Sequence, residues 1–124
     1  MDNEKSKKTL VIGGSENPSR YAYKAVTRLI NSGHEVVIIG KREGKIGGVK
    51  IQTGFPELEK IDTITLYINP LVQEEYESYI LSLNPKRIIF NPGTENSSLL
   101  RRSKEKGILT EIACTLVMLS IDQY

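Results

Sequence analysis

The residues best suited to chemistry follow the first apolar segment, within the stretch from Thr9 to Tyr23, TLVIGGSENPSRYAY. Residues 10–12 form a predicted buried strand, and Gly13-Gly14 allows a sharp turn that leaves backbone N–H groups uncovered. Ser15 adds a hydroxyl and Arg20 adds a cation beside the turn. Because the amides and the positive end of a helix dipole would face the ligand, this arrangement is typical of anion sites. The stretch therefore predicts the phosphate-binding turn of a nucleotide-type ligand.

A second candidate feature is the sequence Gly40-Lys41-Arg42, which directly follows the second apolar segment, residues 35–39. NAD-binding domains place Asp or Glu there to hold the ribose hydroxyls, whereas domains that bind a 2′-phosphate place Arg. Here two cations stand in place of a carboxylate, and the turn GGSENPSR lacks the G-x-G-x-x-G fingerprint. The pair favours a phosphorylated ribose, as in NADP or the 3′-phospho-ADP of coenzyme A. A solvated surface loop is the alternative interpretation.

Other reactive side chains are few. The single histidine, His34, follows Gly33 at an expected helix-to-strand turn, so we predict a surface residue at the opposite end of the sheet from the crevice. No catalytic triad, two-histidine metal site or other catalytic residue is predicted. Cys114 falls at the expected start of the last helix, where the dipole favours a thiolate. The hypothesis is a mixed disulfide or redox-sensitive contact with a ligand thiol, and the alternative is a buried small hydrophobe.

Alternating apolar segments and amphipathic stretches must position these residues. The pattern predicts strands at 10–12, 35–39, 63–68, 87–90 and 108–112, helices at 21–32, 70–83, 97–106 and 114–121, a short edge piece at 49–51 and a helical turn at 55–60. Short connections of this kind indicate a parallel sheet with right-handed crossovers. We expect an α/β fold, a single Rossmann-like three-layer domain with a parallel five-stranded sheet of order 3-2-1-4-5 and helices on both faces.

In that order the winding reverses between the first and fourth strands, and ligands bind outside the carboxyl ends of the strands at such a point. The turn at Gly13-Gly14-Ser15 and the turn at Asn91-Pro92-Gly93 would then lie on opposite sides of one crevice. Asn69-Pro70, after the third predicted strand, has an N-cap residue followed by a proline suited to a first helical turn.

Length and composition limit the class of protein. A chain of 124 residues is predicted to form one domain, 1–124, in which residues 1–7 are a flexible lead-in. A net charge of +2 is too balanced to indicate nucleic-acid binding, and no apolar run reaches the ~18 residues of a membrane span. One cysteine excludes an internal disulfide and suits a reducing compartment, so we expect a cytoplasmic protein. A chain this small has a large surface relative to its core, which is compatible with a homodimer, but the sequence identifies neither an interface nor a protein partner.

A resemblance to a known family rests on four segments, VIGGSENPSRYAYKAVTRLINSGHEVVIIG, DTITLYINP, RIIFNPGTEN and CTLVMLS. The chain resembles the small stand-alone CoA-binding proteins, which are similar to the CoA-binding Rossmann-like domain of the succinyl-CoA synthetase α subunit. The resemblance covers the chain from about Lys8 onward. It implies that Gly13-Gly14-Ser15 and Pro18-Ser19-Arg20 hold the pyrophosphate. It also implies that Gly40-Lys41-Arg42 meets the adenosine end, while two further segments line the groove, Ile68-Asn69-Pro70 and Pro92-Gly93.

The predicted function is binding of coenzyme A or an acyl-CoA through the glycine turn, in a non-catalytic or regulatory role. The sequence has neither the active-site histidine loop nor the ligase domain that the synthetase chemistry requires. Tyr21, Tyr23 and Tyr67 are candidates for stacking on an adenine, with ordinary packing as the competing interpretation. The alternative function is a small NADP-dependent oxidoreductase-type nucleotide-binding domain.

Overall fold

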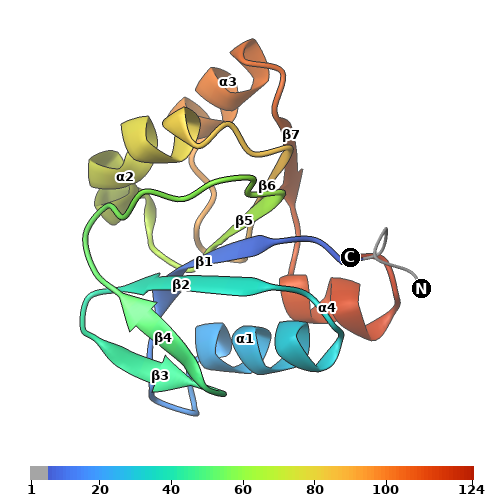
Figure 1. Ribbon diagram of the computed structural model, residues 1–124. Coiled ribbons are helices and arrows are strands. Elements are labelled where there is room, and N and C mark those ends of the chain that lie inside the picture. The colour runs from blue at the N-terminus through green and yellow to red at the C-terminus, as the bar shows by residue number, and fades with distance from the viewer. Residues whose placement is uncertain (1–5) are drawn as a thin grey trace.

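The chain forms one seven-stranded sheet with helices on both faces, and its strands alternate with helices except from β2 to β5, where four strands follow one another (Figure 1). The computed structural model describes residues 6–124. In chain order the elements are β1 (Thr9–Gly14), α1 (Tyr21–Asn31), β2 (Val36–Gly40), β3 (Gly44–Ile46), β4 (Val49–Gln52), β5 (Thr63–Leu66), α2 (Pro70–Ser82), β6 (Arg87–Phe90), α3 (Ser97–Glu105), β7 (Leu109–Ile112) and α4 (Thr115–Ser120).

The two faces of the sheet bury separate apolar clusters, as expected when successive side chains of a strand point to opposite sides. Leu10 and Ile12 of β1 join the cluster on the α2 and α3 side, whereas Val11 joins the cluster on the α1 side. Leu119 of α4 packs against the second cluster, so α1 and α4 share a face. Because helices cover both faces, the central strands are almost continuously apolar. The predicted helices on both faces are confirmed.

The strand order is β3-β4-β2-β1-β5-β6-β7, and only the β3–β4 pair is antiparallel. The expected five-stranded order is wrong, because β5 lies between β1 and β6 instead of beyond β2. The place beside β2 is taken by β4, whose Ile51 pairs with Ile38. Ile51 is buried and Lys50 exposed, so four residues with one apolar face are enough to extend the sheet. A turn at Gly47-Gly48, both with positive φ, returns the chain from β3 to β4.

This correction moves the point where the winding reverses. From β1 the chain winds through β2 to β4 on one side, and β5, β6 and β7 follow on the other. The reversal therefore lies between β1 and β5, so Gly13-Gly14-Ser15 faces the loop after β5. The turn at Asn91-Pro92-Gly93 follows β6, one strand further away, and does not oppose the glycine turn directly. In addition, residues 53–62 contain no helix, so the helical turn predicted at 55–60 is wrong.

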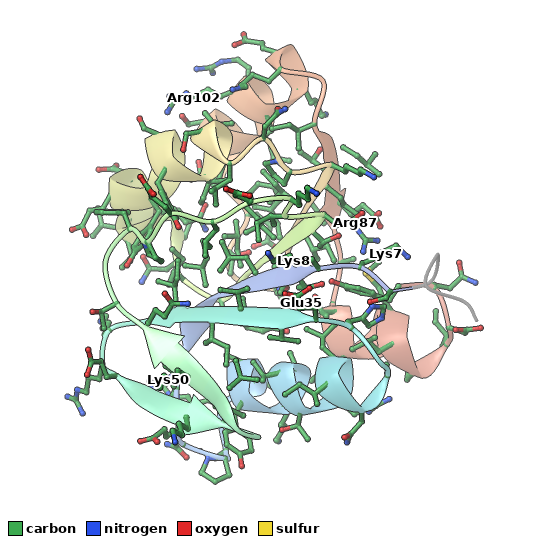
Figure 2. The ribbon with its side chains drawn as sticks, viewed as in Figure 1. Lys7, Lys8, Glu35, Lys50, Arg87 and Arg102 are labelled. Atoms are coloured by element: carbon green, nitrogen blue, oxygen red, sulfur yellow. The ribbon has the colours of Figure 1, made fainter. Side chains whose placement is uncertain are left out.

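Charged residues gather at the amino end of the strands, away from the glycine turn. Figure 2 shows Lys7, Lys8, Glu35 and Arg87 close together there. His34 lies at this end, as predicted; it is half-buried, and its Nδ1 accepts a hydrogen bond of 2.9 Å from the Lys7 amide. Residues 1–5 of the predicted lead-in are outside the described residues. Among residues 6–124, no helix is long and apolar enough to cross a membrane.

Candidate ligand-binding site

The glycine turn is required by close packing between neighbouring backbones. Gly13 has a φ of +107°, and a Cβ there would lie 2.9 Å from the carbonyl carbon and oxygen of Tyr67. A Cβ on Gly14 would lie 2.2 Å from Cγ2 of Ile38. Only glycine fits both positions, so the end of β1 can lie directly against β5 on one side and β2 on the other. The turn therefore lies at the switch point between β1 and β5, the place where ligands bind in sheets of this kind.

The loop that follows is shaped by its own polar side chains. Ser15 Oγ accepts a hydrogen bond of 3.1 Å from the Asn17 amide. Asn17 Oδ1 in turn accepts from the amide and the hydroxyl of Ser19, at 3.0 and 2.8 Å. Residues 16–20, including Pro18 and Arg20, are exposed. These bonds hold the loop in one shape ahead of α1.

Helix α1 has no side-chain cap, in contrast to α2 and α3. Arg20 occupies its N-cap position and makes no capping bond, whereas Asn69 accepts from the Val72 amide and Asn96 caps α3. The predicted Asn69-Pro70 start of α2 is thus confirmed. The first amides of α1 have no side-chain partner within residues 6–124. Because uncapped amides and the helix dipole attract negative charge, the glycine loop leads into a helix end suited to an anion.

The basic pair lies next to this turn. Gly40 pairs with Gly14 across the β1–β2 ladder, and a Cβ on Gly40 would lie 2.4 Å from the Gly14 oxygen. Lys41 and Arg42 follow directly, are exposed, and form no ion pair with any residue of the described chain. The close β1–β2 contact brings these two cations beside the glycine turn. This arrangement can neutralise a phosphate-bearing ligand.

Glu16 is a site residue that the sequence reasoning missed. Its Oε2 accepts a hydrogen bond of 2.8 Å from the Lys45 amide, and its carboxyl carbon packs over Gly44. The contact ties the loop after β1 to the start of β3, next to Lys41 and Arg42. No local pattern indicates it, because the partners are 29 residues apart and meet only when the β3–β4 hairpin forms.

The loop after β5 lies on the other side of the switch point from the glycine turn. Ile68 is half-buried, while Asn69 and Pro70 are exposed at the carboxyl edge. The Tyr67 amide donates to the Ile12 carbonyl at 2.8 Å, which fixes the start of this loop against β1. The structure therefore brings the predicted 68–70 segment together with Gly13.

The three candidate tyrosines differ in accessibility. Burial raises the pKa of Tyr67 to about 12, and its hydroxyl oxygen has no hydrogen-bond partner in the described chain. Tyr23 is half-buried and packs against the α1 cluster. Tyr21 is 68% exposed beside the glycine loop, with Lys24 Nζ 5.4 Å from its ring centroid. Of the three rings, Tyr21 is the one open to a ligand.

The loop after β6 contributes less than the sequence indicated. Asn91 is buried, and its Nδ2 donates to Thr65 Oγ1 and to the Leu66 carbonyl. Its Oδ1 accepts from the Thr115 amide at 2.8 Å, so the side chain links β5, β6 and α4. Pro92 and Gly93 are exposed.

Cys114 lies at the N-cap of α4, as predicted, with a half-buried free thiol. It is close enough to Tyr67 to add to the rise in the pKa of that phenol. Within residues 6–124, no group of three His, Cys, Asp or Glu side chains could hold a metal ion. The candidate site therefore contains glycines, uncapped amides and two cations, and one thiol lies apart from them at the start of α4.

Comparison with known families matches residues 7–120 to the model of a family described as "CoA binding domain". The chain belongs to this CoA-binding domain family. One crystal structure of an uncharacterized protein is 49% identical to this chain, with a TM-score of 0.93 over 96% of this chain and 98% of that chain. No curated protein matches the chain.

Two more distant structures share the fold of this chain. A hypothetical protein from Pyrococcus horikoshii OT3 has 22% identity and a TM-score of 0.84, covering 94% of this chain and 83% of that chain. The dinucleotide forming acetyl-coenzyme A synthetase 1 of Ca. Korarchaeum cryptofilum has 16% identity and a TM-score of 0.70. That match covers 87% of this chain and 26% of the synthetase, so it corresponds to one part of a larger protein.

Proposed function

We propose that the chain binds coenzyme A or an acyl-CoA in the crevice between β1 and β5. The observation that carries the proposal is the Gly14–Gly40 contact, which brings an uncapped helix start close to the cations Lys41 and Arg42. Such a surface suits a ligand with separate phosphate groups, because amides and cations bind phosphate by charge-assisted hydrogen bonds. Membership of the CoA-binding domain family supports coenzyme A among such ligands.

Each group has a proposed role at the phosphate end. The pyrophosphate lies over Gly13-Gly14-Ser15 and the Pro18-Ser19-Arg20 segment, where free amides and one guanidinium face it. Gly40-Lys41-Arg42 takes the 3′-phosphate of the ribose. Tyr21, the exposed ring beside this loop, stacks on the adenine.

The pantetheine arm then crosses the switch point toward the loop after β5. Ile68-Asn69-Pro70 lines its path, and Asn91-Pro92-Gly93 supports the far rim. Cys114 stands near the thiol end of the ligand, and its half-buried sulfur is available for contact. We propose a binding or regulatory role for this site. We assign the function to the cytoplasm, whose reducing conditions suit the free Cys114.

Thermal unfolding with a panel of ligands tests the proposal. A ligand that binds only the folded state raises stability by RT ln(1 + [L]/Kd), about 2.7 kcal/mol at a hundredfold excess over Kd. We expect CoA and acetyl-CoA to raise the unfolding temperature, 3′-dephospho-CoA to raise it less, and NAD not to raise it. A shift with NADP alone would instead assign the chain to the oxidoreductase-type alternative. The absence of any shift would contradict the proposed function.

A further inference from the structure

One buried side-chain amide connects the two loops at the carboxyl ends of β5 and β6. Gln73, in the first turn of α2, is 0% exposed. Its Nε2 donates hydrogen bonds of 2.8 Å to the carbonyl of Ile68 and 2.8 Å to the carbonyl of Thr94. Ile68 belongs to the loop that lines the crevice, and Thr94 belongs to the loop after β6. A single amide group therefore satisfies one carbonyl from each loop.

These two bonds also fix the direction of the next amide in each loop. All peptide bonds of the described chain are trans, so each N–H points away from the preceding carbonyl. With the Ile68 and Thr94 carbonyls turned inward to Gln73, the amides of Asn69 and Glu95 point outward. Neither amide donates a hydrogen bond within residues 6–124. Gln73 thus determines how both loops present their donors at the carboxyl edge.

A chain of buried polar groups holds Gln73 in this orientation. Its Oε1 accepts from Asn96 Nδ2 at 2.9 Å, which also identifies the other end of the amide as the donor. Asn96 donates further to Glu77 Oε2 at 3.1 Å, and Glu77 is 6% exposed. Arg102, labelled on α3 in Figure 2, donates to Glu77 Oε1 at 2.7 Å. Both polar atoms of the Gln73 side chain, Nε2 and Oε1, are therefore held by hydrogen bonds that keep the amide in this orientation.

We propose that Gln73 is a positioning residue that couples the two loops, so that a ligand ordering the 68–70 loop also orders the 91–96 loop. Gln73 itself does not touch the ligand, because it is buried beneath both loops. The effect on ligand affinity rests on the proposed function, whereas the coupling of the loops does not. A purely structural role would stabilise α2 without linking the behaviour of Ile68 to that of Thr94.

The test compares two variants by amide hydrogen exchange, read by NMR in the ligand-free protein. Gln73→Met keeps a side chain of similar length and removes all its polar groups. Ser98→Ala is the matched control, since Ser98 Oγ bonds Glu77 at 3.3 Å within the same network but touches neither carbonyl. Gln73→Met is expected to speed exchange about tenfold or more at both Tyr67 and Thr94, whereas Ser98→Ala leaves both within about twofold. Faster exchange at one amide only, or at neither, overturns the coupling.

A second arm measures affinity for CoA in the same proteins by titration calorimetry. We expect Gln73→Met to weaken binding at least tenfold and Ser98→Ala to leave it within twofold; equal affinities in a folded Gln73→Met protein would contradict the positioning role. If the wild type fails to bind CoA, the proposed function falls while the exchange experiment still decides the coupling. If Gln73→Met does not fold, CoA added to the wild type must slow exchange at both Tyr67 and Thr94, and slowing at one alone refutes the coupling.

Discussion

The backbone of Gly13 lies directly against the backbone of Tyr67, so that a Cβ on Gly13 would stand 2.9 Å from the Tyr67 carbonyl. This contact joins the end of β1 to the loop after β5. The glycine turn therefore has a packing role that is independent of any ligand.

Gly13→Ala is expected to destabilise the fold more than a positive φ alone can explain. Gly33, with a φ of +90° and no atom within 4 Å of an added Cβ, provides the control. We expect Gly33→Ala to cost about 1–2 kcal/mol from backbone strain, and Gly13→Ala to cost about 1–3 kcal/mol more from overpacking. Urea unfolding measures both. Equal losses would show that Tyr67 yields to the added methyl group.

Tyr67→Phe should flatten the loss of stability at high pH. The folded pKa of about 12 exceeds the ordinary value of 10, so the unfolded chain loses this proton first as the pH rises. The raised pKa of Tyr67 therefore contributes fully to the free energy of unfolding below pH 10, and this contribution disappears between pH 10 and about 12. Its size is about 2–3 kcal/mol, at 1.36 kcal/mol per pH unit. Denaturant unfolding at pH 8 and 11 tests this, with Tyr21→Phe as the exposed control. Parallel pH profiles for Tyr67→Phe and wild type would be inconsistent with a buried phenol.

His34 should make the protein less stable in mild acid. Burial, followed by the positive charges of Lys7 and Arg87, lowers the pKa of His34 below 6.5, against a smaller opposing effect of Asp62. The unfolded chain therefore takes up this proton first, and stability present above pH 6.5 is lost as the pH falls toward the folded pKa.

His34→Asn checks this, because an amide oxygen can accept the Lys7 amide bond without titrating. We expect the unfolding temperature of wild type to fall more between pH 7 and pH 5 than that of His34→Asn. Identical pH dependence in the two proteins would mean that His34 is not the group responsible.

Bound CoA should protect Cys114 from alkylation. The thiol is free and half-buried at the carboxyl edge, where the proposed site places the pantetheine arm. We expect saturating CoA to slow carboxamidomethylation of Cys114 at least fivefold, read by intact mass, and NAD to have no effect. An unchanged rate under saturating CoA would place the arm elsewhere.

The sequence predicts the features that depend on neighbouring residues, and it does not predict those that depend on contacts between residues far apart in the chain. Apolar runs predicted the strands at β1, β2, β6 and β7, and Asn69-Pro70 predicted the start of α2, because these signals are local. A strand is predicted at the residues of β5, but its place in the sheet is predicted wrongly. The reason is that β4, which takes the place beside β2, is only four residues long, and its pairing with Ile38 of β2 cannot be recognised from so short a run.

The site divides in the same way. The glycine turn and the Lys41-Arg42 pair were visible as motifs. Asn91 looked like a loop residue, yet partners 26 and 24 residues away, Thr65 and Thr115, bury it. Glu16 likewise acts through a partner distant in sequence, and no composition or periodicity signal reports such contacts.

Titration calorimetry with CoA and 3′-dephospho-CoA tests the central claim most directly. Because Lys41 and Arg42 lie beside the glycine turn and form no ion pair within residues 6–124, we expect CoA to bind at least tenfold more tightly than dephospho-CoA, about 1.4 kcal/mol. The double variant Lys41→Ala, Arg42→Ala should lose this preference, and Lys50→Ala, an exposed cation on β4, should keep it. Absence of CoA binding, or equal affinities of wild type for the two ligands, would contradict the account.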